Sequence, residues 1–446
     1  MKPTKKPLVA IIGAGIAGLS TAYTLSKSGI DVVVYERERH VGGRMSSRTK
    51  DNLVFDYGAD FLADNYETLK LYARELGVEW ISTMPGGRHR VIKNGIPYYL
   101  DAPGIMGLLN LNILTVTERL KLTLFALKLR FFYPDLSLFR LYDVPTRYDT
   151  DTAMNFLTKT VSENAMNYIA DSFTSAMQFH RTDEISSAAL IAHFKMKVTP
   201  GKDFDLRYIK GGIDSIARAI TKKVSVHTDS PVSRVESEEN GTARITIDTN
   251  IKTVDAVVIA TNPYDAAQLL PQATYAQRTL FEGARYASTI VVSFKIPITL
   301  FPDDTHCTYV PYIENTLISG YTNELRKGDD QRSGDTTLMN VYIHEARAKE
   351  LMNSTDSEIF TLIREELNKV SPEARNATLV PHDIHRWPYA MPKFYHGWPT
   401  TVADFLTNHQ GKNNIYLVGD WLCAPWTEGA ALLGKKTAEH IIAKLQ

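Results

Sequence analysis

The 446-residue sequence predicts an α/β fold, and three observations at its two ends support that prediction. Residues 8–12 form a short, continuous apolar run, which is typical of a strand buried on both faces of a parallel sheet. Residues 16–28 carry apolar side chains at helical spacing, and Gly29 follows as a helix stop. Residues 415–418 form a second buried strand, and a helical pattern follows it to the C-terminus.

Three glycines, Gly13, Gly15 and Gly18, stand between the first strand and the first helix with the spacing GxGxxG. The first forms a tight turn, the second lets the backbone approach a pyrophosphate, and the third lets the helix pack close to the strand. The helix N-terminus, which begins at Ile16 and Ala17, offers unpaired N–H groups and partial positive charge to phosphates. The sequence therefore predicts a Rossmann-like βαβ unit that binds a dinucleotide.

An acidic residue ends the second predicted strand, residues 31–35. Glu36 lies 18 residues after Gly18, which is close to the expected distance for a carboxylate that bonds the ribose hydroxyls. An acid at this position argues against the 2′-phosphate of NADP. We include the next residue, Arg37, among the expected cofactor contacts.

The composition of the chain excludes several classes of function. Lysine plus arginine equals aspartate plus glutamate, at 50 each, so nothing indicates a nucleic acid partner. Cys307 and Cys423 are the only cysteines and have no metal-ligand or CxxC spacing, which predicts reduced thiols, no metal site and a cytoplasmic protein. The N-terminus has the composition of a short secretory signal, but its glycine spacing favours the cofactor motif. No apolar stretch is long enough to span a bilayer.

Two more motifs follow the acidic strand end. Gly42 and Gly43 permit another close backbone approach, and Arg44 can pair with a phosphate. The segment 55–61 then reads Phe-Asp-Tyr-Gly-Ala-Asp-Phe, and we include its Gly58, Ala59 and Asp60 among the expected cofactor contacts.

With these motifs, the chain resembles the flavin superfamily that contains amine oxidases, protoporphyrinogen oxidases and phytoene-type desaturases. The matching segments are 9–44, 56–59, 208–212, 260–263, 386–388, 418–420 and 428–430. The resemblance implies FAD held between the first βαβ unit and the last segment of the chain. No cysteine lies between 308 and 422, so we expect the FAD to be bound noncovalently.

The resemblance also assigns roles near the C-terminus. Asp420, after Gly419, would bond the ribityl or pyrophosphate region. Glu428, Gly429 and Ala430 would open the final helix, whose N-terminus would face the flavin pyrimidine edge, where reduced flavin carries negative charge. The backbone of Val232 would meet the adenine.

We expect two domains in an amine-oxidase-like arrangement. Residues 1–85, 205–275 and 410–446 should build a discontinuous, Rossmann-like FAD-binding domain. Residues 86–204 and 276–409 should form an inserted α+β substrate domain, in which helices over 151–196 roof a mixed sheet containing strands at 287–295 and 338–344.

One apolar stretch, residues 105–132, has two interpretations. Its segments 105–109 and 120–132 are apolar around much of the helical circumference, with cations interspersed. A buried helix of the substrate domain is the favoured interpretation. The alternative is weak peripheral contact with a membrane, through which an apolar substrate enters.

The resemblance implies hydride transfer from a substrate C–H bond to flavin N5, with the protein supplying position and electrostatics. We favour oxidation of a C–C or C–N single bond of a largely apolar small molecule to a double bond, with dioxygen or a quinone as acceptor, as in protoporphyrinogen oxidases and desaturases. A flavin amine or amino-acid oxidase is one alternative. A non-catalytic flavin-binding protein is another. The oligomeric state and the catalytic residues stay open.

The candidate substrate-pocket residues also follow from the resemblance. Val291 is aligned where amine oxidases usually carry a lysine, which weakens the amine alternative. The segment 386–397 resembles protoporphyrinogen oxidases and supplies Tyr389 and Tyr395, and Trp426 precedes Thr-Glu-Gly at a substrate-facing position. No Ser-His-Asp set is evident, and His382 and His385 lack a third metal ligand. Arg88 and Arg90 follow a Pro-Gly-Gly segment and are expected to be solvated rather than to bind a substrate carboxylate.

Overall fold

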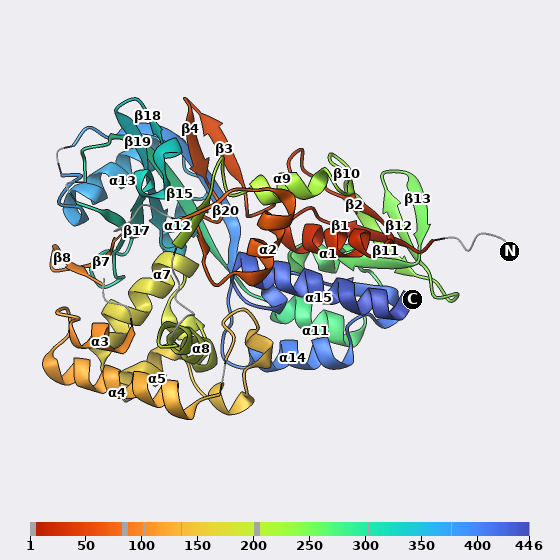
Figure 1. Cartoon of the computed structure of the whole chain (residues 1–446), viewed down its shortest axis with the longest axis horizontal. Helices are drawn as coiled ribbons and strands as arrows, with labels where there is room; N and C mark the ends of the chain where they lie inside the picture. Colours follow the sequence, from red (N-terminus) through yellow and green to blue (C-terminus); the bar gives the residue numbers. More distant parts are fainter. Residues whose placement is uncertain are drawn as a thin grey trace.

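The computed structural model describes residues 6–82, 88–100, 104–134, 136–199, 206–301, 303–375 and 377–445. Figure 1 shows two lobes, one built around a parallel sheet with the chain termini and the other around a larger mixed sheet with a group of helices below it. The Pro85–Gly87 turn expected from the sequence lies outside the described residues. The α/β prediction is confirmed.

The first lobe is organised by a five-stranded parallel sheet in the order β10-β2-β1-β14-β21. Its strands are β1 (Leu8–Ile12), β2 (Asp31–Tyr35), β10 (Ser225–His227), β14 (Ala256–Ile259) and β21 (Ile415–Leu417). Three stretches far apart in the sequence therefore meet in one sheet. The predicted strands 8–12 and 31–35 are confirmed as β1 and β2, and the two pair in parallel with Leu8 opposite Asp31.

The helices α1 (Ile16–Lys27) and α15 (Thr427–Leu445) pack against each other beside this sheet (Figure 1). Glycine permits the close approach, because a Cβ on Gly434 would lie 2.2 Å from the carbonyl oxygen of Ala17. The Ser20 hydroxyl donates to the carbonyl of Ala431 at 2.6 Å, which ties the two helices together. The first and last segments of the chain thus form one structural unit.

The second lobe contains an eight-stranded mixed sheet in the order β20-β15-β19-β17-β16-β7-β8, with β18 paired to β19. The strands are β7 (Arg88–Lys93), β8 (Ile96–Tyr99), β15 (Tyr286–Pro297), β16 (Thr305–Tyr309), β17 (Ile318–Asn323), β18 (Arg332–Ser333), β19 (Thr336–Ile343) and β20 (Val380–Pro392). The predicted strands 287–295 and 338–344 correspond to β15 and β19. The sheet has its own hydrophobic core against the helices α12 (Glu345–Leu351) and α13 (Asp356–Val370).

The helical part of this lobe is broken into short pieces. They are α3 (Gly104–Leu109), α4 (Val116–Phe132), α5 (Ala153–Thr160), α6 (Glu163–Ala165), a π-helical segment (Met166–Asp171), α7 (Ser172–Gln178) and α8 (Ser187–Lys197). The predicted helical character of 151–196 is confirmed. The break after α7 falls at Phe179, which adopts a left-handed backbone conformation.

Smaller elements complete the chain. They are β3 (Ser47–Lys50), β4 (Leu53–Asp56), β5 (Leu62–Ala63), α2 (Glu67–Leu76), β6 (Trp80–Ser82), β9 (Leu206–Ile209), α9 (Ser215–Thr221), β11 (Val232–Ser237), β12 (Ala243–Ile247), β13 (Asn250–Val254), α10 (Pro263–Leu269), α11 (Tyr275–Gly283) and α14 (Trp398–Asn408). The β3–β4 hairpin crosses to the second lobe, where Lys50 Nζ donates to the carbonyl of His382 at 2.6 Å. The two lobes are therefore more interleaved than the domain boundaries that we propose from the sequence would suggest.

The favoured interpretation of 105–132 as an interior helix is wrong for one face of α4. Leu122, Phe125, Ala126 and Leu129 are buried, whereas Val116, Leu120, Leu124, Phe131 and Phe132 are exposed. Figure 1 places α4 at the outer edge of the helical region. Among the described residues, no helix is both long and apolar enough to cross a bilayer.

Candidate active site

A cavity of about 830 Å³ is lined by residues from both sheets, so it joins the two lobes. Most of the residues predicted from the sequence line it, namely Gly13, Gly15, Ile16, Ala17, Glu36, Arg37, Gly42, Gly43, Arg44, Gly58, Ala59, Asp60, Val232, Val291, Tyr389, Gly419, Asp420, Trp426 and Ala430. The lining of this cavity does not include the predicted residues Gly18, Tyr395, Glu428 and Gly429.

The glycine motif lies at one end of the cavity, and a different physical reason explains why each of its positions is a glycine. Gly13 adopts a φ of +102°, and a Cβ there would lie 2.9 Å from the carbonyl oxygen of Ala260. A Cβ on Gly18 would lie 2.1 Å from the carbonyl oxygen of Gly13, so this glycine serves strand–helix packing. By contrast, a Cβ on Gly15 would meet no protein atom within 4 Å. The space beside Gly15 is therefore open, and an added side chain would fill it.

The N-terminus of α1 opens into the same space. Its N-cap residue, Gly15, provides no side-chain hydrogen bond to the first turn. The first turn contains no acidic residue, and its residues Ile16 and Ala17 line the cavity, so the positive end of the helix dipole faces a space that suits a pyrophosphate. These features fit a dinucleotide cofactor.

Glu36 lies at the same end, where backbone N–H groups hold its carboxylate in place. Its Oε2 accepts from Ala14 N at 2.7 Å, and its Oε1 accepts from Glu38 N at 3.0 Å. Each carboxylate oxygen can accept a further hydrogen bond, so ribose hydroxyls remain available partners. The neighbouring Arg37 is largely exposed and pairs with Asp265 at 2.9 Å.

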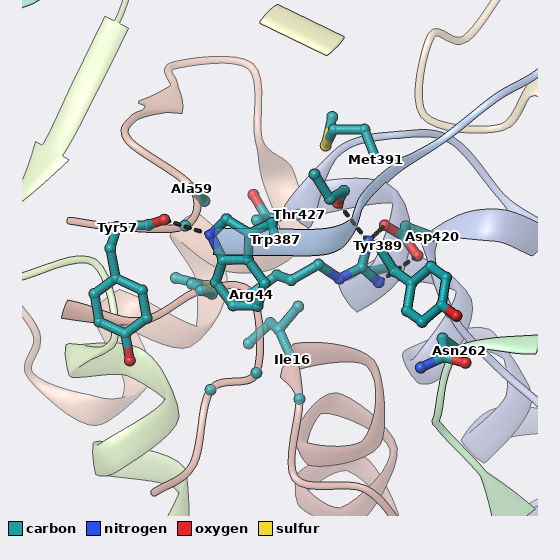
Figure 2. A pocket seen from close by; sticks show the side chains of 18 of the residues that line it. Ile16, Arg44, Tyr57, Ala59, Asn262, Trp387, Tyr389, Met391, Asp420 and Thr427 are labelled. Carbon is teal, nitrogen blue, oxygen red and sulfur yellow. Dashed lines mark hydrogen bonds and ion pairs between the residues drawn. The ribbon is translucent and has the colours of Figure 1, made fainter. Parts of the chain in front are cut away.

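Arg44 and Asp420 pair with each other, a contact that sequence reasoning missed. Arg44 donates to the two carboxylate oxygens of Asp420 at 2.6 and 2.8 Å, and also to the carbonyl of Ala390 at 2.9 Å. The Tyr286 hydroxyl donates to Asp420 at 2.9 Å. Figure 2 shows the Arg44 side chain extending past Trp387 towards Asp420. We assign Arg44 to holding the C-terminal segment against the first lobe rather than to binding a phosphate through its own side chain.

Asp60 belongs to a buried charge cluster centred on Lys327. The Lys327 ammonium lies 2.7 Å from Asp60, 3.0 Å from Asp56 and 2.6 Å from Glu324. Three carboxylates around one ammonium leave surplus negative charge where the cavity meets the second lobe. Burial, followed by repulsion from Asp60, raises the pKa of Glu324 to about 7. The side chain of Asp60 is thus committed to this cluster and to the cavity wall.

Glu428 does not face the cavity. Its carboxylate accepts from Thr68 N at 2.7 Å and from Leu69 N at 3.0 Å, so it caps the N-terminus of α2. Burial raises the pKa of Glu428 to about 7. Gly429 packs against Ala424, because a Cβ there would lie 3.0 Å from the Ala424 side chain. Of the predicted triplet, Ala430 alone lines the cavity.

The end of the cavity in the second lobe is mainly aromatic and apolar. Val291 is buried in β15, between Tyr342 of β19 and His385 of β20. Trp387 stacks beside Tyr57, with ring centroids 6.0 Å apart, and its Nε1 donates to the carbonyl of Tyr57 at 2.5 Å. Further residues of this wall that the sequence did not suggest are Ala176, Met177, Phe179, Cys307, Thr308, Tyr309, Tyr321 and Thr322.

The two candidate tyrosines, Tyr389 and Tyr395, lie in different surroundings. Tyr389 lines the cavity and packs against Tyr264, with ring centroids 4.5 Å apart. The prediction that Tyr395 lines the substrate pocket is wrong. Its hydroxyl donates to the carbonyl of Gly283 at 2.7 Å, and its ring stacks on Trp398. It therefore packs the segment between β20 and α14 against α11.

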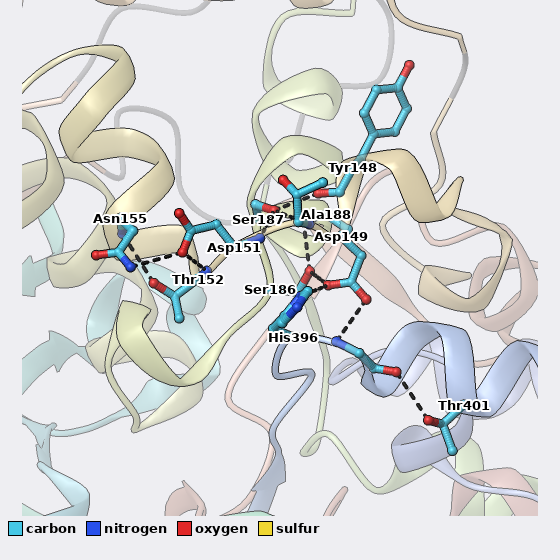
Figure 3. Close-up of polar contacts among 12 residues, drawn as sticks. Tyr148, Asp149, Asp151, Thr152, Asn155, Ser186, Ser187, Ala188, His396 and Thr401 are labelled. Carbon is cyan, nitrogen blue, oxygen red and sulfur yellow. Dashed lines mark hydrogen bonds and ion pairs between the residues drawn. The ribbon is translucent and has the colours of Figure 1, made fainter.

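One Ser, one His and one Asp do meet, at the junction shown in Figure 3. Asp149 Oδ1 accepts from the Ser186 hydroxyl at 2.6 Å and lies 3.0 Å from His396 Nδ1, and Asp149 Oδ2 accepts from Gly397 N at 2.9 Å. Ser186 also accepts from Ala188 N as the N-cap of α8. Both the serine and the histidine bond the aspartate rather than each other, so no base activates the serine as in a hydrolase. The network is structural.

Arg90 is buried rather than solvated, contrary to the sequence expectation. Its guanidinium donates to both carboxylate oxygens of Glu373, at 2.7 and 2.9 Å. Its side chain is therefore paired within the protein and not free for a substrate carboxylate.

Comparison with known families decides the identity of this site. Residues 16–442 match the model of the family described as flavin containing amine oxidoreductase. This protein belongs to that family. It is an FAD-dependent oxidoreductase, and the glycine motif and helix terminus described above are the features that fit FAD.

Relatives of this flavin-containing amine oxidoreductase act on different substrates. The 15-cis-phytoene desaturase of Capsicum annuum is 22% identical over 99% of this chain and 78% of its own length. The mitochondrial protoporphyrinogen oxidase of Nicotiana tabacum is 31% identical, but over only 26% of this chain and 23% of its own length. A solved structure of a putrescine oxidase triple mutant has a TM-score of 0.80 at 17% identity and covers 98% of this chain and 99% of that chain.

Proposed function

We propose that this oxidoreductase converts a C–C or C–N single bond of a largely apolar small molecule to a double bond, with dioxygen or a quinone as the final acceptor. The observation that carries the proposal is the continuous cavity, which begins at the cofactor motif and ends among aromatic and aliphatic side chains. FAD, when bound, supplies the hydride acceptor at N5. A wall made largely of aromatic and aliphatic side chains favours an apolar substrate over a sugar or a phosphate ester.

The residues of the chain would bind and orient rather than attack the substrate. Gly15 and the N-terminus of α1 would hold the pyrophosphate, and Glu36 would hold the ribose. Trp426 and Val291 would bound the space in which the substrate lies. No serine in a hydrolase-like arrangement was found among the described residues, which is consistent with chemistry that the cofactor performs.

Anaerobic reduction of the purified holoenzyme tests this proposal. Porphyrinogens, polyenes, cyclic imines and amines are added separately, and absorbance near the flavin band is followed. Bleaching by a porphyrinogen or a polyene supports the proposal, and readmission of air shows whether dioxygen is the acceptor. Bleaching by simple amines alone would contradict a largely apolar substrate and favour the amine oxidase considered below. The absence of bleaching across the panel would favour a flavin-binding protein without turnover.

A second candidate function, an amine or amino-acid oxidase, is favoured by one observation. Asp60 places a carboxylate at the cavity wall, inside a cluster with three carboxylates and one ammonium. Such a site attracts a cationic substrate. The variant Asp60→Asn separates the two functions: it should lower kcat/KM at least tenfold for an amine and leave a neutral polyene nearly unaffected. A matched control is Asp304→Asn, at a half-exposed carboxylate beside Arg88.

We also propose that α4 contacts a membrane surface. Its exposed face carries Leu120, Leu124 and Phe131, with Lys121 and Lys128 between them, which suits a lipid surface with anionic headgroups. Co-sedimentation with vesicles that contain anionic lipid should show binding that Leu124→Ser with Phe131→Ser reduces several-fold. The control is Ile251→Ser, at an equally exposed apolar residue of β13. Equal binding by all three proteins, or no binding by the wild type, would contradict the proposal.

A further inference from the structure

A group of three potential metal ligands lies in the mixed sheet, outside the cofactor motif. His89 is on β7, and His306 and Cys307 are on β16. The ligand atoms of these three side chains all lie within 4.8 Å of one another. Because the histidines are 217 residues apart in the sequence, no spacing pattern could indicate the group. We propose that His89, His306 and Cys307 form a zinc site that joins β7 to β16.

The strand register explains how two adjacent residues of β16 reach one point. Cys307 is paired with His89 across the parallel β16–β7 ladder. The register shifts between Thr305 and Cys307, so an irregularity falls at His306. Neighbours on a regular strand point to opposite faces, and a bulge re-aims a side chain and removes that restriction. The irregular backbone thus places both side chains beside His89.

The burial of His306 without partners is the second observation. His306 is 1% exposed, and neither Nδ1 nor Nε2 has a hydrogen-bond partner among the described residues. A buried polar group without a hydrogen-bond partner destabilises the folded protein. A neutral imidazole carries one lone pair, on the ring nitrogen that lacks the proton. A bound metal ion would give that lone pair a partner.

His89 is already oriented as a metal ligand usually is. Its Nδ1 lies 2.6 Å from the hydroxyl of Tyr309. Ligating histidines commonly bond a neighbouring group through one ring nitrogen, which fixes the ring and leaves the other nitrogen for the metal. Tyr309 would therefore act as a positioning residue, with Nε2 of His89 as the ligand atom.

Charged groups of both signs lie near the three side chains. The carboxylates of Asp60 and Glu324 act electrostatically on Cys307, and the cations Lys327 and Arg326 act on His306. On binding, zinc would replace the thiol proton, which leaves for solvent, and a Zn–S bond would form without any change of oxidation state.

The donor set indicates which metal would bind. Two imidazole nitrogens and one thiolate are ligands that zinc takes in tetrahedral sites, whereas magnesium and calcium require oxygen. Three protein ligands leave a fourth position, and Cys307 lines the cavity. This inference does not depend on which substrate the enzyme oxidises.

Zinc retention by the FAD-loaded protein tests the proposal. Wild type, Cys307→Ser, His306→Gln and Cys423→Ser are each given one equivalent of Zn²⁺, dialysed against metal-free buffer and analysed for metal. Cys423 is the matched control, because it is the other buried free cysteine and its thiol bonds the carbonyl of Phe139. Wild type and Cys423→Ser should retain about one zinc per chain, and Cys307→Ser and His306→Gln should bind at least tenfold more weakly.

X-ray absorption at the zinc edge of the wild type tests the proposed ligands directly, so its result does not depend on whether a variant folds. A sulfur scatterer at about 2.3 Å with nitrogen at about 2.0 to 2.1 Å is the expected result. Zinc retained equally by all four proteins, no zinc retained by the wild type, or a first shell without sulfur would each overturn the proposal. Added zinc should also raise the Tm of the wild type and leave that of Cys307→Ser unchanged.

Discussion

The two ends of the cavity are built by different means. At the cofactor end, the wall is mostly backbone: Gly13, Gly15 and the first turn of α1 lie within a few residues of one another. At the substrate end, the wall is made of side chains from strands far apart in the sequence, such as Val291 of β15 and Tyr342 of β19. Backbone recognition requires glycines at fixed spacing and so leaves a local signature. A side-chain wall of packed apolar residues leaves none.

The largest expected effect separates two glycines of the same motif. Gly18→Ala should destabilise the protein by more than about 3 kcal/mol, because its Cβ would lie 2.1 Å from a backbone oxygen that cannot move away. Gly15→Ala should cost less than about 1 kcal/mol in the FAD-free protein, because its Cβ meets nothing within 4 Å. Urea unfolding of both apoproteins measures the difference. Equal losses would show that Gly15 is also a packing glycine.

The next effect concerns the ion pair that joins the two ends of the chain. Arg44→Ala should lower the free energy of unfolding by roughly 3 kcal/mol, because it leaves the largely buried carboxylate of Asp420 without its bidentate partner. The control is Arg37→Ala, whose exposed pair with Asp265 should contribute less than about 1 kcal/mol. Denaturant unfolding of both variants tests the comparison. Similar small losses would mean that Arg44 does not hold the C-terminal segment.

A third prediction concerns pH, through the cap of α2. The pKa of Glu428 is raised from 4.5 to about 7 in the folded protein, so folding favours the protonated carboxyl. Its contribution to stability is fully present below pH 4.5 and is lost as the pH rises through 7, on the order of 2 to 3 kcal/mol. Glu428→Gln should therefore show a smaller loss of stability between pH 5.5 and 8.5 than the wild type.

The pH experiment has a matched control in an exposed carboxylate. Glu79 pairs with Lys210 at the surface, so Glu79→Gln should leave the pH dependence of stability unchanged. If Glu428→Gln retains the full pH dependence of the wild type, the carboxyl of Glu428 is ionised in the folded state and the prediction is wrong.

The smallest expected effect concerns Tyr395, which lies outside the cavity lining. Tyr395→Phe removes one hydrogen bond to the carbonyl of Gly283 and should cost about 1 kcal/mol of stability. Its kinetic constants should match those of the wild type, whereas Trp426→Ala at the cavity wall should raise KM or lower kcat. A change in KM for Tyr395→Phe without a change in stability would return this residue to the substrate site.

The sequence predicted the elements that local patterns specify. The strand–glycine–helix unit, the acid at Glu36 and the closing strand and helix all follow from short-range spacing. Contacts between residues far apart in the sequence could not be predicted. Arg44 pairs with Asp420, 376 residues away, and Lys327 pairs with carboxylates from both lobes. The α4 helix shows a third limit, because an apolar sequence pattern does not reveal whether a neighbouring element covers each face.

The most direct test of the account is the flavin content of the wild type and of Gly15→Val after acid precipitation. The account predicts about one FAD per chain released into the supernatant from the wild type, and a folded but colourless Gly15→Val, because the new side chain fills the space that the cofactor requires. Flavin that stays with the precipitated protein would contradict noncovalent binding. A full complement of FAD in Gly15→Val would contradict the assignment of the glycine end of the cavity to the cofactor.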